Sequence, residues 1–275
     1  MRLPSIFVPL TLCAALAGCV DGLDAPPVPE TPECVPPATR AGQSAVISGE
    51  IVDQVTGEPI AADVAFNTAW DVVDAFPGEC EPLATFTTSD DGRFGPRTID
   101  VGSTEYPPIA LFMITGDDLA DTASDQTLTC DGADCDDLDH AMAVPERDLA
   151  GGWRRELERG GMPGASSRGL VLFRFNEADG SPAAGVVPQT LTAEPVLVPG
   201  VQVRFLEDDR ATLAPPDTAE TTASGMAIIG IDEELASGYI FGTRGDDSWD
   251  AVDVLSPPGW IFLEDERPVA PQPPP

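Results

Sequence analysis

The stretch "GEIVDQVTGEPIAADVAF", from Gly49 to Phe66, decides the fold. Short runs rich in Val, Ile and Phe flank a central Thr-Gly-Glu-Pro, in which Gly57 is the glycine. Such runs are typical of strands, and a Thr-Gly pair supplies the positive φ angle that a tight turn needs. The stretch therefore predicts a strand, a tight turn and a second strand.

The same pattern recurs further along the chain in "LFRFNEADGSPAAGVV", from Leu172 to Val187. A glycine-containing hairpin follows each copy, namely "TTSDDGRFG" from Thr87 to Gly95 and "TTASGMAIIGI" from Thr221 to Ile231. The alignment matches Asp53 and Thr56-Gly57-Glu58-Pro59 with Asn176 and Asp179-Gly180-Ser181-Pro182. This internal repeat predicts two copies of one structural unit.

Other short apolar runs, such as "ATFTTS", "PIALFMIT" and "VQVRF", are also bounded by Gly and Pro, which favours an all-β sandwich fold. With the repeated motifs, the chain resembles the carboxypeptidase regulatory-like domains, which are small transthyretin-like β-sandwiches. The resemblance implies two transthyretin-like or immunoglobulin-like β-sandwich domains in tandem. It also implies a non-catalytic scaffold, and it brings no catalytic residue.

One helix is expected between the copies, in "ERDLAGGWRRELERGG". Leu149, Trp153 and Leu157 fall on one face of it, with Asp148 as N-cap and Gly160 as the stop. The expected organisation is a lipoprotein signal peptide over 1–18, a lipidated cysteine with a disordered Pro-rich linker over 19–43, a first β-sandwich over 44–146, a helix and linker over 147–168, a second β-sandwich over 169–265 and a disordered Pro-rich tail over 266–275.

The first residues have the layout of an export signal: a positive charge at Arg2, an apolar run over 3–17, and small residues before Cys19. Leu16-Ala17-Gly18-Cys19 resembles the lipobox of bacterial lipoproteins, in which the cysteine receives a diacylglyceryl group. We therefore expect acyl chains such as palmitate on Cys19 and a membrane anchor in the cell envelope. In some bacteria, an aspartate directly after the lipidated cysteine retains a lipoprotein at the inner membrane. This chain has Val20 at that position, which favours the outer membrane. A secreted protein is the alternative.

Charge limits the partners. The chain has 47 acidic residues and 14 basic ones, all arginine, and a formal charge of −33. Such a field repels nucleic acid, so nucleic-acid binding is excluded from the expected functions. The one basic cluster is expected to pair with carboxylates of the same chain, and it consists of Arg147, Arg154, Arg155 and Arg159.

Cys13 leaves with the signal peptide and Cys19 takes the lipid, so four cysteines remain. An even number in an exported protein favours two disulfides, with three connectivities open. The favoured pairing is Cys130 with Cys135 and Cys34 with Cys80. Zinc bound by four thiolates is the rival, but the spacing lacks two C-x-x-C pairs.

The loop "TCDGADCDDLDHAMAV", from Thr129 to Val144, is the candidate metal site. Its carboxylates are hard oxygen ligands of the kind calcium prefers, and they are Asp131, Asp134, Asp136, Asp137 and Asp139. The spacing departs from the EF-hand pattern, and a disulfide-closed, solvated loop is the favoured alternative. His140, the chain's single histidine, is expected to be a surface or packing residue rather than a ligand.

The sequence favours a non-enzymatic role. It lacks G-x-S-x-G, H-E-x-x-H and P-loop motifs, and any Ser-His system would need His140. The preferred function is a lipid-anchored binding or adhesion module for a protein or glycan partner. The alternative is a structural spacer or assembly component of the envelope without a specific ligand, stabilised by calcium if the loop binds it. A hydrolase is a distant third.

Trp70, Trp249 and Trp260 are candidates for stacking on sugars, and "TRGD" from Thr243 to Asp246 is a chance match to an integrin-binding tripeptide.

Overall fold

Strands and one helix make up the described part of the chain. The structure is a computed structural model of the full chain, and it describes residues 43–69, 82–101, 109–131, 134–162, 165, 169–190, 201–231, 238–249, 252–254 and 258–268. The predicted signal peptide, Cys19 and the linker up to residue 42 lie outside these residues, as does the tail from residue 269 onward. The all-β fold class predicted from the sequence is confirmed.

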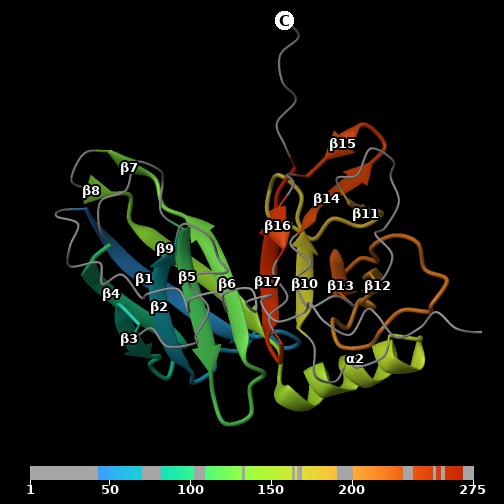
Figure 1. Ribbon diagram of the computed structural model, residues 1–275, viewed down its shortest axis with the longest axis horizontal. Coiled ribbons are helices and arrows are strands. Elements are labelled where there is room, and N and C mark those ends of the chain that lie inside the picture. The colour runs from blue at the N-terminus through green and yellow to red at the C-terminus, as the bar shows by residue number, and fades with distance from the viewer. Residues whose placement is uncertain are drawn as a thin grey trace, which may run out of the picture. The chain divides into compact units, whose positions relative to one another are not determined.

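Each copy of the repeat supplies its own set of strands, which Figure 1 shows in blue to green and in yellow to red. The first copy forms β1 (Ser44–Asp53), β2 (Asp63–Ala69), β3 (Ala84–Thr87), β4 (Arg93–Asp100), β5 (Ile109–Thr115), β6 (Thr122–Thr127), β7 (Cys130–Asp131), β8 (Asp134–Cys135) and β9 (Leu138–Val144). After helix α2 (Arg147–Arg159), the second forms β10 (Leu170–Phe175), β11 (Val187–Thr190), β12 (Val201–Phe205), β13 (Met226–Ile231), β14 (Gly238–Arg244), β15 (Asp247–Ser248), β16 (Val252–Val254) and β17 (Ile261–Glu266).

The repeated turns close with equivalent backbone hydrogen bonds. The Asp53 N–H donates to the Glu58 carbonyl at 2.8 Å, and the Glu177 N–H donates to the Ser181 carbonyl at 2.7 Å. The first turn is therefore one residue longer than the second. This corrects the sequence alignment at one point, because Asp53 corresponds to Glu177 and not to Asn176.

The glycine of each downstream hairpin lies against the first strand of its own copy. The Ile51 N–H donates to the Gly92 carbonyl at 2.8 Å, and the Phe175 N–H donates to the Gly225 carbonyl at 2.9 Å. Both glycines have positive φ angles, 74° and 68°. A Cβ on Gly92 would lie 2.4 Å from the Ile51 carbonyl oxygen, and one on Gly225 would lie 2.6 Å from that of Phe175. Only glycine fits either position without displacing backbone.

The threonine that precedes each hairpin ties it to the strand after the turn. The Thr88 hydroxyl accepts from the Ala62 N–H at 2.8 Å, and the Thr221 hydroxyl accepts from the Val186 N–H at 2.9 Å. Two distant segments with little identity thus make the same contacts. The internal repeat inferred from the sequence is a repeat of three-dimensional structure.

Strand pairing has the same plan in both copies. In the first copy, β1 pairs antiparallel with β4 and parallel with β9. In the second, β10 pairs antiparallel with β13 and parallel with β17. The opposing sheets are built on β2 with β5 and on β11 with β14, both antiparallel. Each copy is therefore a β-sandwich of the same topology around its first strand.

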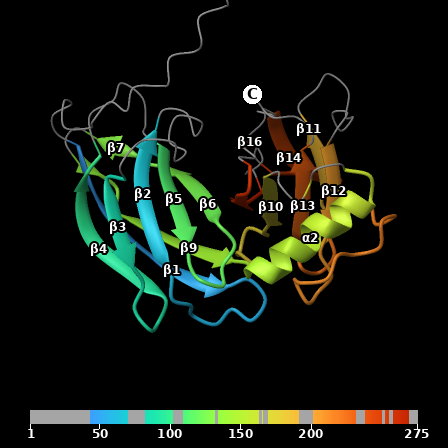
Figure 2. The ribbon, with the colours of Figure 1, turned by 60° about the horizontal axis from the view of Figure 1, so that its bottom comes forward.

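One sheet continues from the first sandwich into the second. Its eight strands follow the order β12-β13-β10-β17-β6-β5-β2-β3, so that one sheet of each sandwich belongs to it. The join is a parallel pairing of β17 with β6, in which Phe262 lies opposite Ala123 and Leu263 opposite Ser124. Figure 1 shows β17 beside β6, and Figure 2 shows α2 running across β13 of the same sheet. The sequence contains no local sign of this pairing.

Aromatic side chains fill the space between the facing sheets. In the first sandwich Phe94 of β4 meets Phe112 of β5 with ring centroids 6.0 Å apart, and Phe66 meets Phe112 at 5.3 Å. In the second, Phe175 packs edge-on against Trp249 at 6.1 Å. Tilted and edge-to-face pairs of this kind add to the stabilisation that burial gives.

Helix α2 covers the continuous sheet with Ala150, Trp153 and Leu157, which are buried. The helix ends at Gly160, as predicted, and the Gly160 N–H donates to the Glu156 carbonyl. The predicted N-cap, Asp148, is wrong: Glu146 is the N-cap, without a side-chain hydrogen bond, and Asp148 lies in the first turn. The helix starts earlier because its first helical hydrogen bond runs from the Ala150 N–H to the Glu146 carbonyl, at 3.0 Å. Within the described residues, no helix has both the length and the apolar character needed to cross a membrane.

Candidate functional site

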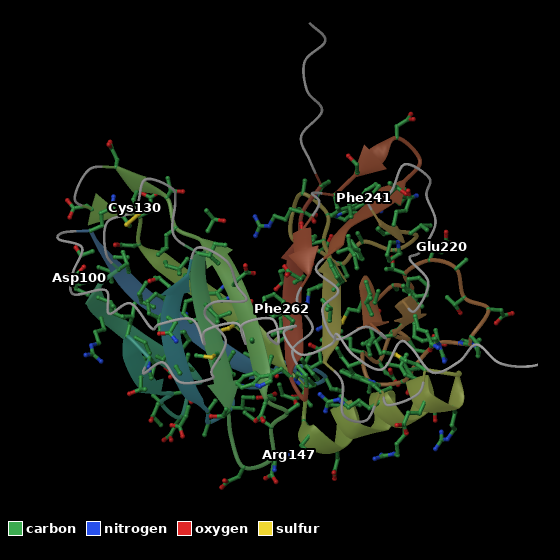
Figure 3. The ribbon with its side chains drawn as sticks, in the orientation of Figure 1. Asp100, Cys130, Arg147, Glu220, Phe241 and Phe262 are labelled. Carbon is green, nitrogen blue, oxygen red and sulfur yellow. A yellow bond between two sulfur atoms is a disulfide. The ribbon has the colours of Figure 1, made fainter. Side chains whose placement is uncertain are left out.

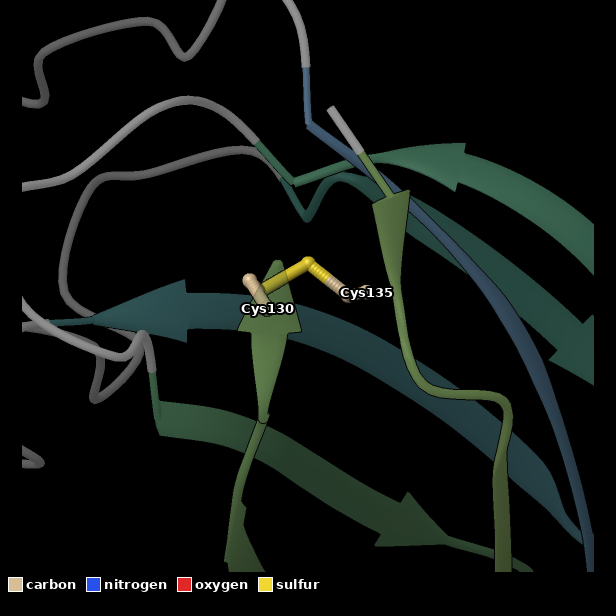
Figure 4. The surroundings of a disulfide bond; sticks show 2 residues. All are labelled: Cys130 and Cys135. Atoms are coloured by element: carbon tan, nitrogen blue, oxygen red, sulfur yellow. A yellow bond between two sulfur atoms is a disulfide. The ribbon is translucent and has the colours of Figure 1, made fainter. Parts of the chain in front are cut away.

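The acidic loop of the first sandwich contains the disulfide favoured from the sequence. Cys130 on β7 and Cys135 on β8 are joined, and their strands pair antiparallel (Figure 4). Figure 3 shows Cys130 at the end of the sandwich where β7 and β8 lie. The predicted lipidation site Cys19 and the predicted partners Cys34 and Cys80 lie outside the described residues.

The five candidate calcium ligands do not converge. Asp131 and Asp134 are opposite each other in the β7–β8 pairing, where two like charges are unfavourable neighbours. Asp136 and Asp137 are exposed, and Asp139 accepts a hydrogen bond from the Ser48 hydroxyl at 3.1 Å. In the part of the chain that the structure describes, no three His, Cys, Asp or Glu side chains are grouped as a metal site. Calcium binding stays a prediction to which this geometry adds no support.

His140 packs between the two sheets of the first sandwich. Its ring stacks on Phe112 with centroids 5.0 Å apart, and its Nε2 lies 2.9 Å from the Ser124 hydroxyl. Burial lowers the pKa of His140 to about 4, against the opposing effect of the carboxylates of Asp265 and Asp139. The imidazole is therefore neutral at pH 7, and the expectation of a packing residue is confirmed.

A serine beside a histidine is the arrangement of nucleophile and base in many hydrolases. Ser124 is 5% exposed, however, and its hydroxyl also lies 3.3 Å from the Leu263 carbonyl oxygen on β17. The pair therefore connects β9, β6 and β17 at the place where the two sandwiches join. Sequence reasoning missed this contact, since the two residues are 16 positions apart on different strands.

The expected pairing of the α2 arginine cluster with carboxylates is confirmed for Arg159, whereas Arg147 and Arg154 donate to backbone carbonyls. Arg147 donates to the Gly116 carbonyl at 3.0 Å, and Arg154 donates to the Gly259 carbonyl at 2.8 Å. In the described residues, only Arg159 of this cluster forms an ion pair, with Glu156. The helix is thereby attached to the β5–β6 turn of the first copy and to the segment before β17. Figure 3 labels Arg147 at the start of α2.

A groove lies where α2 ends. Its volume is about 460 Å³, and one wall is the last turn of the helix while the other is the hairpin that follows β12. The lining residues are Glu156, Arg159, Gly160, Arg204, Glu207, Leu213, Ala214, Pro215 and Pro216. The lining residues include two arginines, two glutamates and several apolar residues, and they come from segments far apart in the sequence.

Trp249 is buried, contrary to its expected exposure, and Arg244 is engaged in contacts within the chain. Trp249 is 1% exposed, and its indole N–H donates to the Asn176 carbonyl at 2.9 Å. Arg244 of the "TRGD" stretch lies over the Trp249 ring at 5.2 Å and makes two hydrogen bonds with the Glu177 carboxylate. These bonds lower the pKa of Glu177. Trp260 is half-buried and Trp70 lies outside the described residues.

Comparison with known proteins yields no family model and no curated protein that matches this chain. Among solved structures, 3-chlorocatechol 1,2-dioxygenase from Rhodococcus opacus aligns over 43% of this chain and 68% of its own, with 15% identity and a TM-score of 0.28. A shaft pilin from Lactobacillus rhamnosus GG aligns over 85% of this chain and 100% of its own, with 13% identity and a TM-score of 0.23. Likenesses at this level identify neither a family nor a function.

Proposed function

We propose that this chain is a lipid-anchored protein of the bacterial cell envelope, in which two carboxypeptidase regulatory-like sandwiches act as a non-catalytic binding or adhesion module for a protein or glycan partner. The observation that carries the proposal is the combination of a lipobox ending at Cys19 with an all-β double sandwich further along the chain. An anchored sandwich pair presents large surfaces away from the lipid, and it needs no catalytic centre to do so.

The state of the polar groups supports a role in binding. Ser124 is buried and bonded to the partly buried His140, and Arg244 is held by Glu177. The contacts described for these side chains are made within the sandwiches. Contacts with a partner would therefore come from other residues on the outer surfaces. The formal charge of −33 favours partners that are neutral or cationic.

A structural spacer is the second candidate, and the continuous sheet is the observation that favours it. The β6–β17 pairing joins the sandwiches through hydrogen-bonded strands rather than through a flexible linker alone. A rigid double sandwich on a Pro-rich stalk would hold other envelope components at a set distance from the lipid.

The anchor is tested by metabolic labelling with an alkyne analogue of palmitate in a Gram-negative host. The full chain is expected to incorporate the label and to fractionate with the outer membrane, whereas Cys19→Ser is expected to lose the label. Equal labelling of both chains would refute the anchor at Cys19.

Binding is tested with the purified mature chain on a glycan array and against envelope extracts. Saturable binding to one partner class is the result expected of a binding module. A mature chain that is lipidated and folded but retains nothing in either screen would favour the spacer.

A further inference from the structure

We infer that the outer edge of strand β9 binds an extended, basic segment of a protein partner, which joins the sheet as an added parallel strand. The outer edge is the side of β9 that faces away from β1. This inference rests on the proposed binding function and names one site and the chemistry of its partner. It goes beyond that proposal because it assigns the contacts that would select the partner.

The outer edge of β9 is open. Within the described residues β9 pairs with β1 alone. The Gln54 N–H, just past β1, donates to the Val144 carbonyl, so the backbone groups of Val144 point toward β1. Alternate residues of a strand point their backbone groups to opposite sides, so those of Asp139 and Ala141, which are both exposed, point outward. Such a row of N–H and C=O groups is a template for another strand.

The second copy shows what an edge in this position accepts. Ile51 and Phe175 are equivalent, because each donates its N–H to the glycine of the downstream hairpin. Ile51 lies opposite Met142 of β9. Phe175 lies opposite Glu266 of β17, so β17 is the counterpart of β9. The outer edge of β17 is taken by β6 as a parallel strand, which is the pairing that we infer for the β9 edge.

The side chains of the two edges differ in charge. By the same register, Asp139 is the counterpart of Leu263 in β17. Asp137, two residues earlier, is the counterpart of Ile261. Leu263 and Ile261 are buried, whereas both aspartates are exposed. The β17 edge therefore suits the uncharged side chains that β6 presents to it, and the β9 edge suits positive ones.

The two carboxylates are open to a cationic side chain. Neither Asp137 nor Asp139 forms an ion pair in the part of the chain that the structure describes. Asp139 accepts a hydrogen bond from the Ser48 hydroxyl, which is neutral and leaves the charge in place. Opposite charges on neighbouring strands favour their pairing and like charges oppose it. The edge thus selects a basic segment and rejects an acidic one, in line with the formal charge of −33.

The register also defines the pattern of the bound segment. Facing residues of paired strands lie on the same side of a sheet, and side chains alternate along each strand. Residues of the segment opposite Asp137 and Asp139 therefore share the exposed side with the carboxylates. The residue between them lies opposite Leu138, which belongs to the core and is 5% exposed. A matching segment alternates basic and apolar residues.

The apolar positions of the segment make its backbone bonds. In the β6–β17 pairing, the Asp121 carbonyl accepts from the Ile261 N–H. Ala123, in the same alternating set as Asp121, lies opposite Phe262, the counterpart of Leu138. Proline at the apolar positions therefore removes N–H groups that would bond to β9, and it leaves the charge of the segment unchanged.

Three matched peptides test the inference on the purified mature chain in about 0.15 M salt. They are acetyl-Arg-Val-Arg-Val-Arg-amide, its analogue with proline for both valines, and its analogue with glutamate for all three arginines. The valine peptide is expected to bind with a dissociation constant on the order of 0.1 to 1 mM and to shift the amide resonances of Asp139 and Ala141. The proline peptide should bind at least tenfold more weakly, and the glutamate peptide should not bind. Equal binding of the valine and proline peptides, or shifts confined to other parts of the protein, would overturn the inference.

Variants of the edge separate charge from backbone pairing. Asp139→Asn removes the carboxylate and keeps the N–H, so binding of the valine peptide should weaken about threefold to tenfold. Asp139→Pro removes the N–H as well, and binding should be at least tenfold weaker than in Asp139→Asn. Proline is tolerated at an open edge, where its missing N–H would face solvent.

Asp208→Asn is the matched control for charge. It also removes one exposed carboxylate, from the hairpin after β12, and should leave binding of the valine peptide unchanged. Thermal unfolding of each variant controls for loss of fold, and Asp139→Asn with the three peptides remains decisive if Asp139→Pro unfolds. Equal weakening in Asp139→Asn and Asp208→Asn would contradict the assignment, because it would mean that the peptide responds only to the overall charge.

The same variants separate the inference from the proposed function. A protein partner found in the extract screen is expected to be lost in Asp139→Pro and retained in Asp208→Asn. If the partner binds Asp139→Pro as tightly as the wild type, the edge is not the partner site, and the binding module stands. If the wild type binds the valine peptide as expected but neither screen yields a partner, the proposed binding function fails and the assignment of the edge stands.

Discussion

The hydroxyl of Ser124 and the Nε2 of His140 lie 2.9 Å apart between the two sheets of the first sandwich. Ser124 is also the last residue of β6 that is paired with β17, opposite Leu263. The contact therefore joins β9, the last strand of the first copy, to β6 at the point where β6 pairs with β17, the last strand of the second copy. A neutral imidazole suits this environment, because a charged one would lose its hydration there.

Stability is expected to fall between about pH 6.5 and pH 4. The folded state holds the pKa of His140 at about 4, below its ordinary 6.5, so the unfolded chain takes up the proton first as the pH falls. The stability that comes from burying a neutral His140 is fully present above pH 6.5. By pH 4, the free energy of unfolding is lower by about 3 kcal/mol at most. Urea unfolding at half-unit steps of pH measures it.

His140→Gln is the control for this pH dependence. Glutamine keeps a hydrogen-bonding group near Ser124 but does not titrate, so the slope between pH 5 and 6.5 should largely disappear. A slope in the variant equal to that of the wild type would assign the effect to carboxylates instead.

The close approach of Gly92 to β1 predicts a large cost for Gly92→Ala. The positive φ angle alone costs about 1 to 2 kcal/mol, and the new Cβ would also meet the Ile51 carbonyl oxygen at 2.4 Å. We expect a loss of more than about 2 kcal/mol in the free energy of unfolding.

Gly57→Ala is the matched variant, since Gly57 has a φ of 71° but no atom within 4 Å of the added Cβ. This substitution should lower the free energy of unfolding by about 1 kcal/mol. Similar losses at both positions would mean that backbone strain, and not the contact with Ile51, sets the cost.

The Asp53 carboxylate organises the first turn, and Asp53→Ala should destabilise the protein by about 1 to 3 kcal/mol. Its Oδ1 accepts from the Val55 N–H, the Thr56 N–H and the Thr56 hydroxyl at 2.7 to 3.1 Å. Asp63→Ala, which removes a single exposed bond from Thr87, should cost less than about 0.5 kcal/mol. Chemical denaturation of both variants makes the comparison.

Calcium and magnesium should have equal and weak effects on the thermal midpoint. The carboxylates of the acidic loop do not converge in the described residues, so divalent ions would only screen a surface of like charges. Scans with each ion and with chelator measure this. A saturable rise with calcium alone, abolished by Asp134→Asn with Asp136→Asn, would instead show a specific site in the loop.

Local features of the fold could be predicted from the sequence, because they depend on residues close together in the chain. The turn at Gly57, its counterpart at Gly180 and the helix stop at Gly160 all occur as expected. The short spacing between Cys130 and Cys135 likewise pointed to their disulfide.

Contacts between distant segments could not be predicted. Leu263 and Ser124 pair across 139 positions, and neither strand carries a sign of its partner. The same limit explains why Trp249 was expected to be exposed: its position near a strand end does not reveal that Asn176 and Arg244 enclose it. The groove at Arg204 also depends on segments that meet only in the fold.

The pairing of β6 with β17 is the central claim, and the Ile261 amide tests it most directly. This N–H donates to the Asp121 carbonyl at 2.9 Å, across the join between the two copies. Hydrogen exchange with nuclear Overhauser spectroscopy should find the Ile261 amide strongly protected and the backbone of Phe262 close to that of Ala123. Rapid exchange at Ile261 together with no cross-strand signal between Phe262 and Ala123 would contradict the continuous sheet.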